Sequence, residues 1–289
     1  MPAPRTLRKH RLDLYPWGLH LSNCGEGVIM ARVFITGSSD GLGQMAAQLL
    51  IEQGHNVVLH ARSEQRSRQA LGAVPGAESV VIGDLASMAQ TRNVAEQVNR
   101  LGEVDAVIHN AAVGYQEPRR VATEDGLPHV FAINTLAPYI LTALIHPPKR
   151  LIYLSSGLHQ SGDASLKDLA WEQRPWRGQQ AYSDSKLHDV LLAFAIARRW
   201  PGVLSNALEP GWVPTKMGGR GAPDDLDQGH RTQVWLAASD DKDATVTGQY
   251  FFHMRPRKPN PATRDPLIQD ALIDACSRFS GVTLRADGA

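Results

Sequence analysis

From residue 31 onward, short runs of β-branched and other apolar residues alternate with longer segments whose composition is typical of helices. This alternation constrains the fold more than any other feature of the chain. Parallel strands need a long crossover between them, and a helix usually provides it. The pattern therefore predicts βαβ units and an α/β domain with a doubly wound parallel sheet and helices on both faces. About seven strands are expected, at residues 32–35, 57–60, 79–82, 106–109, 151–154, 203–207 and 248–252.

A chain of 289 residues suits one large domain with appendages. We expect a single catalytic domain over residues 30–255. A proline-rich link then leads into a carboxyl-terminal extension, residues 256–289, with a short helix around 267–279. We interpret residues 1–29 as an amino-terminal extension. It is either disordered or the product of translation from an upstream start, with Met30 as the natural first residue.

The charge balance argues against nucleic acid as a partner, because 30 basic residues oppose 29 acidic ones and leave a net charge of +1. The apolar run 190–197 is far too short to span a membrane. Two cysteines without metal-ligand spacing favour a reducing, cytoplasmic location. His60, His109 and His188 lack a carboxylate or cysteine at ligand spacing, so we expect no metal site.

A glycine-rich turn, Thr36–Gly43, lies between the first predicted strand and the first predicted helix. Gly37 and Gly41 permit a tight turn and a close approach of the backbone to a pyrophosphate, and Gly43 allows the helix to pack closely on the sheet. The amino terminus of that helix offers free N–H groups to an anion. An ordinary glycine-rich turn would look the same in isolation, but its position between a strand and a helix favours nucleotide binding.

The second strand ends in His60-Ala61-Arg62, with no carboxylate to accept a hydrogen bond from a ribose 2′-hydroxyl. The guanidinium of Arg62 can pair bidentately with a 2′-phosphate, and Arg66 is a second candidate contact. We therefore expect NADP(H) in preference to NAD(H). The alternative is that Arg62 is only a solvated surface residue.

Tyr182 and Lys186 are four residues apart, on one face of a predicted helix. A phenol titrates near pH 10. A positive charge about 4 Å away contributes about 4 kcal/mol at an effective dielectric constant near 20, or roughly three pKa units. We therefore expect Lys186 to bring the pKa of Tyr182 close to 7, where general acid–base catalysis is efficient. Tyrosine and lysine also occur at this spacing by chance, so the pair alone is weak support.

Seven segments, in the same order, resemble the short-chain dehydrogenase/reductase superfamily over roughly residues 31–255. The turn T-G-S-S-D-G-L-G is similar to the family's T-G-x-x-x-G-x-G, and Tyr182 with Lys186 matches Y-x-x-x-K. His109–Gly114 resembles the N-N-A-G segment, with His109 in place of the first asparagine and one extra residue before the glycine. Pro210–Thr215 resembles the P-G-x-V-x-T segment that anchors the nicotinamide carboxamide.

The resemblance implies a Rossmann-type fold and assigns roles to particular residues. Tyr182 would be the general acid or base, Lys186 would lower its pKa and hold the nicotinamide ribose, and Ser156 would donate to the substrate oxygen. Asn134 would position a water molecule that relays protons. The cofactor-binding residues implied, with Arg62 from the argument above, are Thr36, Gly37, Ser39, Asp40, Gly41, Leu42, Gly43, Arg62, Asp84, Leu85, Asn110, Ala111, Tyr182, Lys186, Pro210, Gly211, Val213 and Thr215.

Ser156 and Tyr182 are 26 residues apart, about twice the usual gap in the family. This insertion resembles the retinol-dehydrogenase-like and protochlorophyllide-reductase-like branches. Together with the loop 211–231 it should lie at the carboxyl edge of the sheet, where ligands bind. Neither loop carries a motif that names the substrate. Their tryptophans could line an apolar pocket or pack on one another.

The sequence therefore predicts an NADP(H)-dependent oxidoreductase that interconverts a small-molecule carbonyl and an alcohol. One alternative is reduction of a C=C bond conjugated to a carbonyl. Another is a sensor or scaffold that binds NADP without turnover. The helix of Tyr182 carries apolar residues compatible either with a homo-oligomer interface or with simple core packing, namely Leu187, Val190, Leu191 and Phe194.

Overall fold

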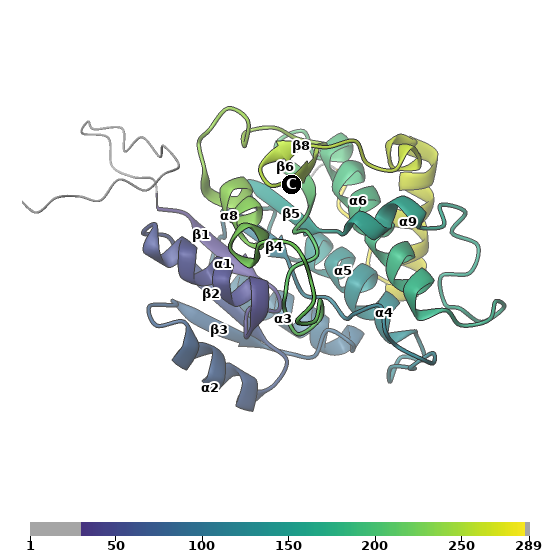
Figure 1. Cartoon of the computed structure of the whole chain (residues 1–289), viewed down its shortest axis with the longest axis horizontal. Coiled ribbons are helices and arrows are strands. Elements are labelled where there is room, and N and C mark those ends of the chain that lie inside the picture. Colours follow the sequence, from purple (N-terminus) through teal and green to yellow (C-terminus); the bar gives the residue numbers. More distant parts are fainter. Residues whose placement is uncertain (1–29, 287–289) are drawn as a thin grey trace, which may run out of the picture.

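The computed structural model describes residues 30–286, so the expectation for residues 1–29 lies outside the described part. The described chain is built around one eight-stranded sheet in the order β3-β2-β1-β4-β5-β6-β7-β8 (Figure 1). The strands are β1 Arg32–Ile35, β2 Asn56–Ala61, β3 Ser79–Ile82, β4 Ala106–His109, β5 Arg150–Leu154, β6 Leu204–Glu209, β7 Tyr250–Phe252 and β8 Arg255–Pro256.

Strands β1 to β7 run parallel, as predicted, and β8 is antiparallel. The helices between the strands are α1 Gly41–Glu52, α2 Glu64–Ala73, α3 Met88–Arg100, α4 His129–Phe131, α5 Ala137–Leu144, α6 Gly178–Arg199, α7 Leu226–Gly229 and α8 Arg231–Ala238, and α9 Pro266–Ser280 follows the last strand. The strand order reverses beside β1, which pairs with β2 on one side and β4 on the other. Ligands bind in the crevice outside such a switch point.

Two hydrophobic clusters cover the two faces of the sheet. On one face α1 and α8 pack on strand residues such as Val33 and Leu208. On the other face α3, α5, α6 and α9 pack on residues such as Phe34 and Tyr153. Because both faces are buried, the strands contain near-continuous apolar runs instead of alternating ones. This is the doubly wound α/β fold that the sequence predicted.

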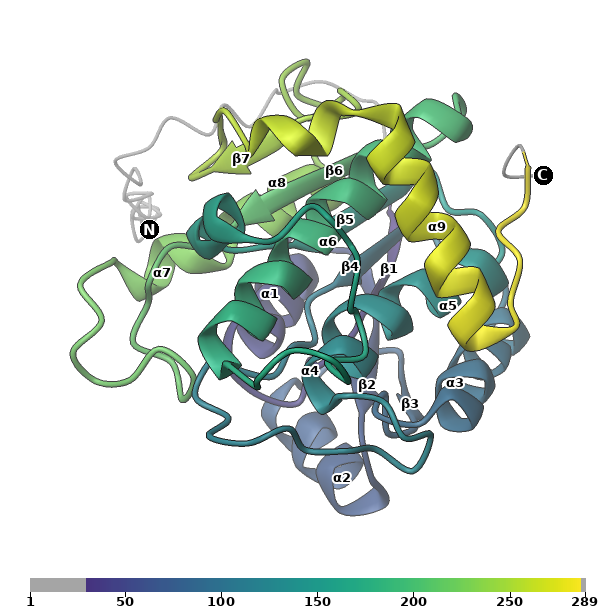
Figure 2. The same cartoon turned by 90° about the vertical axis from the view of Figure 1, so that its right-hand side faces the viewer.

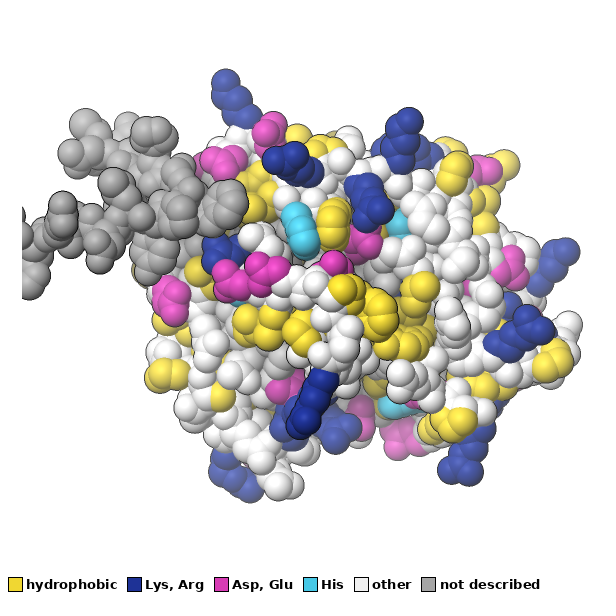
Figure 3. Space-filling view, viewed as in Figure 1, with side chains coloured by type: hydrophobic (Ala, Val, Ile, Leu, Met, Phe, Trp, Pro, Cys, Tyr) yellow, Lys and Arg dark blue, Asp and Glu magenta, His cyan; other side chains and the backbone are white. Residues whose placement is uncertain are grey.

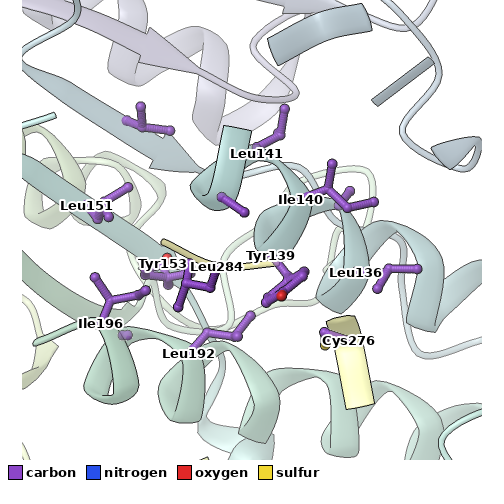
Figure 4. Close-up of a cluster of buried hydrophobic side chains, with 14 of the residues drawn as sticks. Leu136, Tyr139, Ile140, Leu141, Leu151, Tyr153, Leu192, Ile196, Cys276 and Leu284 are labelled. Atoms are coloured by element: carbon purple, nitrogen blue, oxygen red, sulfur yellow. The ribbon is translucent and has the colours of Figure 1, made fainter. Parts of the chain in front are cut away.

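The carboxyl-terminal segment packs on α5 and α6 (Figures 2 and 4). The phenol of Tyr139 on α5 donates a hydrogen bond to the carbonyl of Val282, 2.8 Å away, and the indole of Trp200 donates to the carbonyl of Arg285. Cys276 on α9 is fully buried there, and this burial raises the pKa of its thiol. These contacts make residues 266–285 a wall of the larger core.

The apolar residues of α6 that could have formed an interface between copies are instead buried within the chain. Leu187, Val190 and Leu191 have no exposed surface, and Phe194 is buried among residues of the same cluster. Figure 2 shows α9 lying across α6 and α5. This set therefore gives no support to a homo-oligomer.

The eighth strand was not predicted. His253 and Met254 connect β7 to β8, and both have positive φ, at 49° and 60°. Two residues with positive φ form the tight hairpin turn that matches the twist of antiparallel strands. Such turns usually carry glycine or asparagine, so His253-Met254 gives no turn signal in the sequence.

None of the helices within residues 30–286 combines the length and the apolar composition that crossing a membrane would require.

Candidate active site

A cleft of about 580 Å³ opens at the carboxyl edge of the sheet, between the turn after β1 and the amino-terminal half of α6. Its size is typical of a cofactor or small-molecule site. Most of the predicted cofactor residues line it, together with Tyr182 and Lys186. The predicted residues in the wall are Gly37, Ser39, Asp40, Gly41, Leu42, Arg62, Asp84, Leu85, Asn110, Ala111, Tyr182, Lys186, Pro210 and Thr215.

Gly37 is held where no other residue would fit. Its φ of +64° is left-handed, and a Cβ placed there would lie 2.8 Å from the Cα of Ala111. Its N–H donates to Nδ1 of His60, 3.0 Å away, so the ring donates from Nε2 to the carbonyl of Gly83. Burial lowers the pKa of His60 and keeps the ring neutral. His60 thus holds the glycine-rich turn in place through hydrogen bonds, a role that the sequence did not reveal.

Two other predicted residues, Thr36 and Gly43, lie behind the cleft wall and shape it. The Thr36 hydroxyl accepts hydrogen bonds from the N–H groups of Asn110 and Ala111, each 3.0 Å away. A Cβ on Gly43 would lie 2.7 Å from the carbonyl oxygen of Gly37. These contacts bring the turn after β1 against the segment after β4.

The amino terminus of α1 is suited to a bound pyrophosphate. Asp40 occupies the N-cap position, but its side chain makes no capping hydrogen bond. Gly41 has a φ of +58° and nothing within 4 Å of where a Cβ would stand, so an approaching ligand meets no side chain there. Uncapped N–H groups beside open space match an anionic group. The residues present therefore fit a dinucleotide.

Two cations, Arg66 and Lys216, contact Asp40 at the nucleotide end of the cleft, and Arg62 lies in the same wall. Arg66 donates to the Asp40 carboxylate at 2.7 Å and to the Ser39 hydroxyl at 3.0 Å, and Lys216 donates to Asp40 at 2.8 Å. Although partial burial opposes it, Lys216 and Arg66 hold the pKa of Asp40 below its usual value. Arg62 is exposed in the same wall. The local charge is positive, and Lys216, one residue beyond the Pro210–Thr215 segment, escaped the sequence analysis.

Tyr182 and Lys186 lie on α6, both buried apart from the surface they present to the cleft. The Lys186 ammonium lies 5.7 Å from the centre of the Tyr182 ring. It donates to the carbonyl of Leu154 at 2.7 Å and to the carboxylate of Asp189 at 2.8 Å. Asp189 was not among the predicted residues, although it follows Lys186 by three positions on the same helix.

The expected pKa of Tyr182 is wrong. Burial raises the pKa of this phenol above 10, and the Lys186 charge, which lowers it, only partly compensates. The Asp189 carboxylate also raises it. The sequence spacing predicted the favourable charge of Lys186. It predicted neither the desolvation of the phenol nor the negative charge of Asp189, and both oppose ionisation of the phenol.

Ser156 and Asn134 are not among the residues that line the cleft, but each contacts one that does. Ser156 follows β5, and its hydroxyl favours the ionised form of Tyr182 and so lowers the pKa of the phenol. Asn134 lies in a π-helical turn, Ala132–Leu136, a distortion common at functional sites. Its side chain accepts from the N–H of Val113 at 2.8 Å and donates to the Ser185 hydroxyl at 3.1 Å. Asn134 therefore ties one wall of the cleft to α6.

The loop after β6 supplies Pro210 and Thr215 to the cleft, while Val213 is buried behind it and Gly211 turns with a φ of +88°. Met217, from the same loop, places its sulfur 3.9 Å from the Tyr182 hydroxyl. Figure 3 shows hydrophobic side chains gathered near the middle of the face that it presents. The space next to the phenol is therefore partly apolar.

The long insertion, residues 157–181, is ordered by its own contacts. Arg174 lies 3.6 Å above the Trp171 ring and pairs at 2.6 Å with Asp184, which is buried on α6. Trp171 and Trp176 meet edge to face at 5.1 Å. Of the two readings left open, packing of these tryptophans on one another is the one observed, whereas Trp212 is exposed.

Comparison with known proteins identifies the family of the chain. A family model described as short chain dehydrogenase matches residues 31–225. An uncharacterized oxidoreductase of Emericella nidulans is 46% identical over 88% of this chain and 98% of its own. Retinol dehydrogenase 13 of Mus musculus is 29% identical over 87% and 84%. The crystal structure of an uncharacterized protein from Mycobacterium paratuberculosis superposes with a TM-score of 0.76, 25% identity and coverage of 88% and 95%. The chain thus belongs to the short-chain dehydrogenase family, in its retinol-dehydrogenase-like branch, and is an NAD(P)-dependent oxidoreductase.

Proposed function

We propose that this oxidoreductase uses NADP(H) to interconvert a carbonyl and an alcohol on a small, partly apolar substrate. The observation that supports the proposal most directly is that the Tyr182 phenol and the Lys186 ammonium line the same cleft as the glycine turn. A proton donor and a dinucleotide site thus face one space. The apolar surface beside the phenol, with Met217 in contact, favours a substrate with hydrophobic parts.

In this mechanism, the chain supplies orientation and the proton. A bound nicotinamide supplies or accepts the hydride. Tyr182 protonates the carbonyl oxygen during reduction and removes the hydroxyl proton during oxidation. The Ser156 hydroxyl donates to the same oxygen and stabilises the alkoxide charge that develops there. Lys186 keeps a positive charge near the phenol, and Asn134 holds Ser185 and Val113 in place.

The basic cluster around Asp40 supports NADP(H) over NAD(H). Arg62 and Arg66 can pair with a 2′-phosphate, and the Ser39 hydroxyl, already 3.0 Å from Arg66, can donate to it. No carboxylate follows β2 in the position that would accept from a 2′-hydroxyl. Asp40 is an acidic residue within this cluster, and Arg66 and Lys216 neutralise it.

Replacing Arg66 with alanine is expected to raise the KM for NADPH about tenfold or more, because a charge-assisted hydrogen bond contributes about 1.5–3 kcal/mol. The KM for NADH should change little, since NADH has no 2′-phosphate. Steady-state kinetics with both cofactors measures the ratio. Arg68→Ala is the matched control, because Arg68 lies exposed on the same helix α2 and outside the cleft wall. An equal loss with both cofactors would contradict the preference.

Reduction of a conjugated C=C bond uses the same cofactor and proton donor, so products must be identified. We would follow NADPH oxidation across aldehydes, ketones and enones and analyse the products by mass spectrometry. Alcohol products are expected. Saturated ketones from the enones would establish the alternative reaction. Tight binding of NADPH without turnover of any compound would favour a sensor or scaffold.

A further inference from the structure

We propose that Asp189 is a positioning residue for Lys186, holding the ammonium group charged and aimed at the cofactor side of the cleft. This inference rests on the proposed function, in which Lys186 acts on the Tyr182 phenol. It assigns a role to a residue that touches neither the phenol nor the cleft wall. Asp189 would act through the lysine, in addition to the rise that its charge causes in the pKa of the Tyr182 phenol.

The geometry is that of a fully enclosed ion pair. Lys186 and Asp189 lie three residues apart on α6, with their charged atoms 2.8 Å apart. Their side chains are only 4% and 3% exposed. An ammonium group has three N–H donors. One points to Asp189 and a second to the carbonyl of Leu154, 2.7 Å away, so the third is left for the cleft that Lys186 lines.

The two contacts together fix where the lysine points. Leu154 is the last residue of β5, so its carbonyl holds the ammonium against the end of the sheet. Asp189 holds it from the helix side. A long, flexible lysine chain is otherwise free to rotate, and ordering it carries an entropy cost. The pair therefore orders the ammonium group before any cofactor arrives.

The charges point the same way. Burial by itself lowers the pKa of a lysine, because the charged form loses its hydration. Here the Asp189 carboxylate reverses that effect and raises the pKa of Lys186. Burial raises the pKa of Asp189, while Lys186 opposes the rise. We take the charged pair as the dominant form, because the two groups are in direct hydrogen-bond contact.

The other ionisable groups that face this pair are phenols. Tyr153 on β5 has its pKa raised first by burial and also by Asp189. Tyr182 precedes Lys186 on α6, with Tyr115 packed edge to face against it and Tyr250 of β7 nearby. Phenols are neutral at physiological pH and cannot replace a counter-ion. Within residues 30–286, the anion in contact with the Lys186 ammonium is thus Asp189.

The inference is tested by titrating Lys186 in the full chain. Lysine labelled with ¹³C at Cε reports the charge of each amine by NMR, and the Lys186 signal is the one lost in Lys186→Met. In Asp189→Asn, the titration midpoint of Lys186 is expected to fall by about one to three pH units, because the buried ammonium has lost its counter-charge. The ammonium form, present below the midpoint, would then be lost at lower pH.

Activity should follow the same shift. The alkaline limb of the kcat profile for carbonyl reduction should move to lower pH in Asp189→Asn, by about as much as the lysine midpoint. The KM for the carbonyl substrate should change less than kcat, because Asp189 does not line the cleft. An unchanged Lys186 midpoint in Asp189→Asn would overturn the proposal.

Asp184→Asn is the matched control. Asp184 is also a buried aspartate of α6, but its partner is Arg174 of the insertion. Its replacement should lower stability and leave the Lys186 midpoint unchanged. If Asp189→Asn does not fold, Asp189→Ser, which is also uncharged and is smaller, takes its place in the titration. A Lys186 midpoint lowered by a pH unit or more supports the proposal, and one near that of the wild type contradicts it.

The titration needs no turnover, so the two proposals can fail separately. An active Tyr182→Phe variant would remove the proposed chemistry, whereas the Lys186 midpoint would still report on Asp189. Conversely, an inactive Tyr182→Phe variant with an unmoved midpoint in Asp189→Asn would leave the chemistry standing and discard the role of Asp189.

Discussion

Replacing Tyr182 with phenylalanine is expected to lower kcat by about 10²–10⁴-fold, the usual contribution of a positioned general acid or base. The substitution removes one hydroxyl and keeps the ring, so the edge-to-face contact with Tyr115 and the buried position on α6 are retained. Binding of NADPH should be nearly unchanged, because the glycine turn and the basic cluster are not altered. Stopped-flow kinetics and a fluorescence titration of NADPH would measure the two quantities separately.

Tyr139→Phe provides the control for this result. It also removes one buried phenol hydroxyl, which donates to the carbonyl of Val282 in the core between α5 and the carboxyl-terminal segment. It should destabilise the protein by about 1–3 kcal/mol, because a buried acceptor loses its donor, and leave kcat close to that of the wild type. Full activity of Tyr182→Phe on every substrate that the enzyme turns over would rule out the assigned proton donor.

Replacing Gly37 with alanine is expected to raise the Kd for NADPH by about ten- to a hundredfold, as loss of charge-assisted hydrogen bonds to a phosphate would. The new Cβ would stand 2.8 Å from the Cα of Ala111 and 3.0 Å from its Cβ. The Cα belongs to the backbone of Ala111 and the Cβ is fixed rigidly to it, so neither atom can rotate away. The turn after β1 and the segment after β4 must therefore move apart. The hydrogen bond from Gly37 to His60 would stretch with them. Isothermal titration with NADPH measures the loss.

Gly54→Ala is the control for Gly37→Ala. It has the cost of a left-handed backbone without the clash that a Cβ on residue 37 makes with Ala111. Gly54 has a φ of +87°, but nothing lies within 4 Å of where its Cβ would stand. Its replacement should cost about 1–2 kcal/mol of folding stability, the usual penalty for a left-handed conformation, and leave the Kd for NADPH unchanged. Similar NADPH binding by both variants would mean that the contact with Ala111 does not shape the nucleotide site.

Much of the fold followed from local patterns. The six predicted strands from residue 32 to residue 207 each overlap an observed strand, because both faces of the sheet are covered and each strand is a continuous apolar run. The final helix, expected around 267–279, is α9 at Pro266–Ser280. Strand β8 was missed, because its hairpin turn places His253 and Met254 at positive φ, a conformation that glycine usually adopts.

The site was partly readable in the same way. The glycine turn, Arg62 and the tyrosine–lysine pair all line one cleft. Lys216 and Met217 were missed, because the Pro210–Thr215 motif ends just before them and gives them no role. Asp189 was visible in principle, since residues three apart share a helix face. The role of Asp189 as a counter-ion depends on its burial with Lys186, and sequence spacing carries no information about burial.

The sequence by itself determined the family, the parallel sheet and most of the group of residues that line the cleft, because periodicity, turn chemistry and motif order are local properties. The tertiary structure alone decided the electrostatics of that group. It buried Tyr182 so that the pKa of its phenol rises, and it enclosed the lysine charge with Asp189. It also turned the apolar side of α6 inward. Desolvation and contact depend on what surrounds a side chain in three dimensions, and that environment is assembled from segments far apart in the sequence.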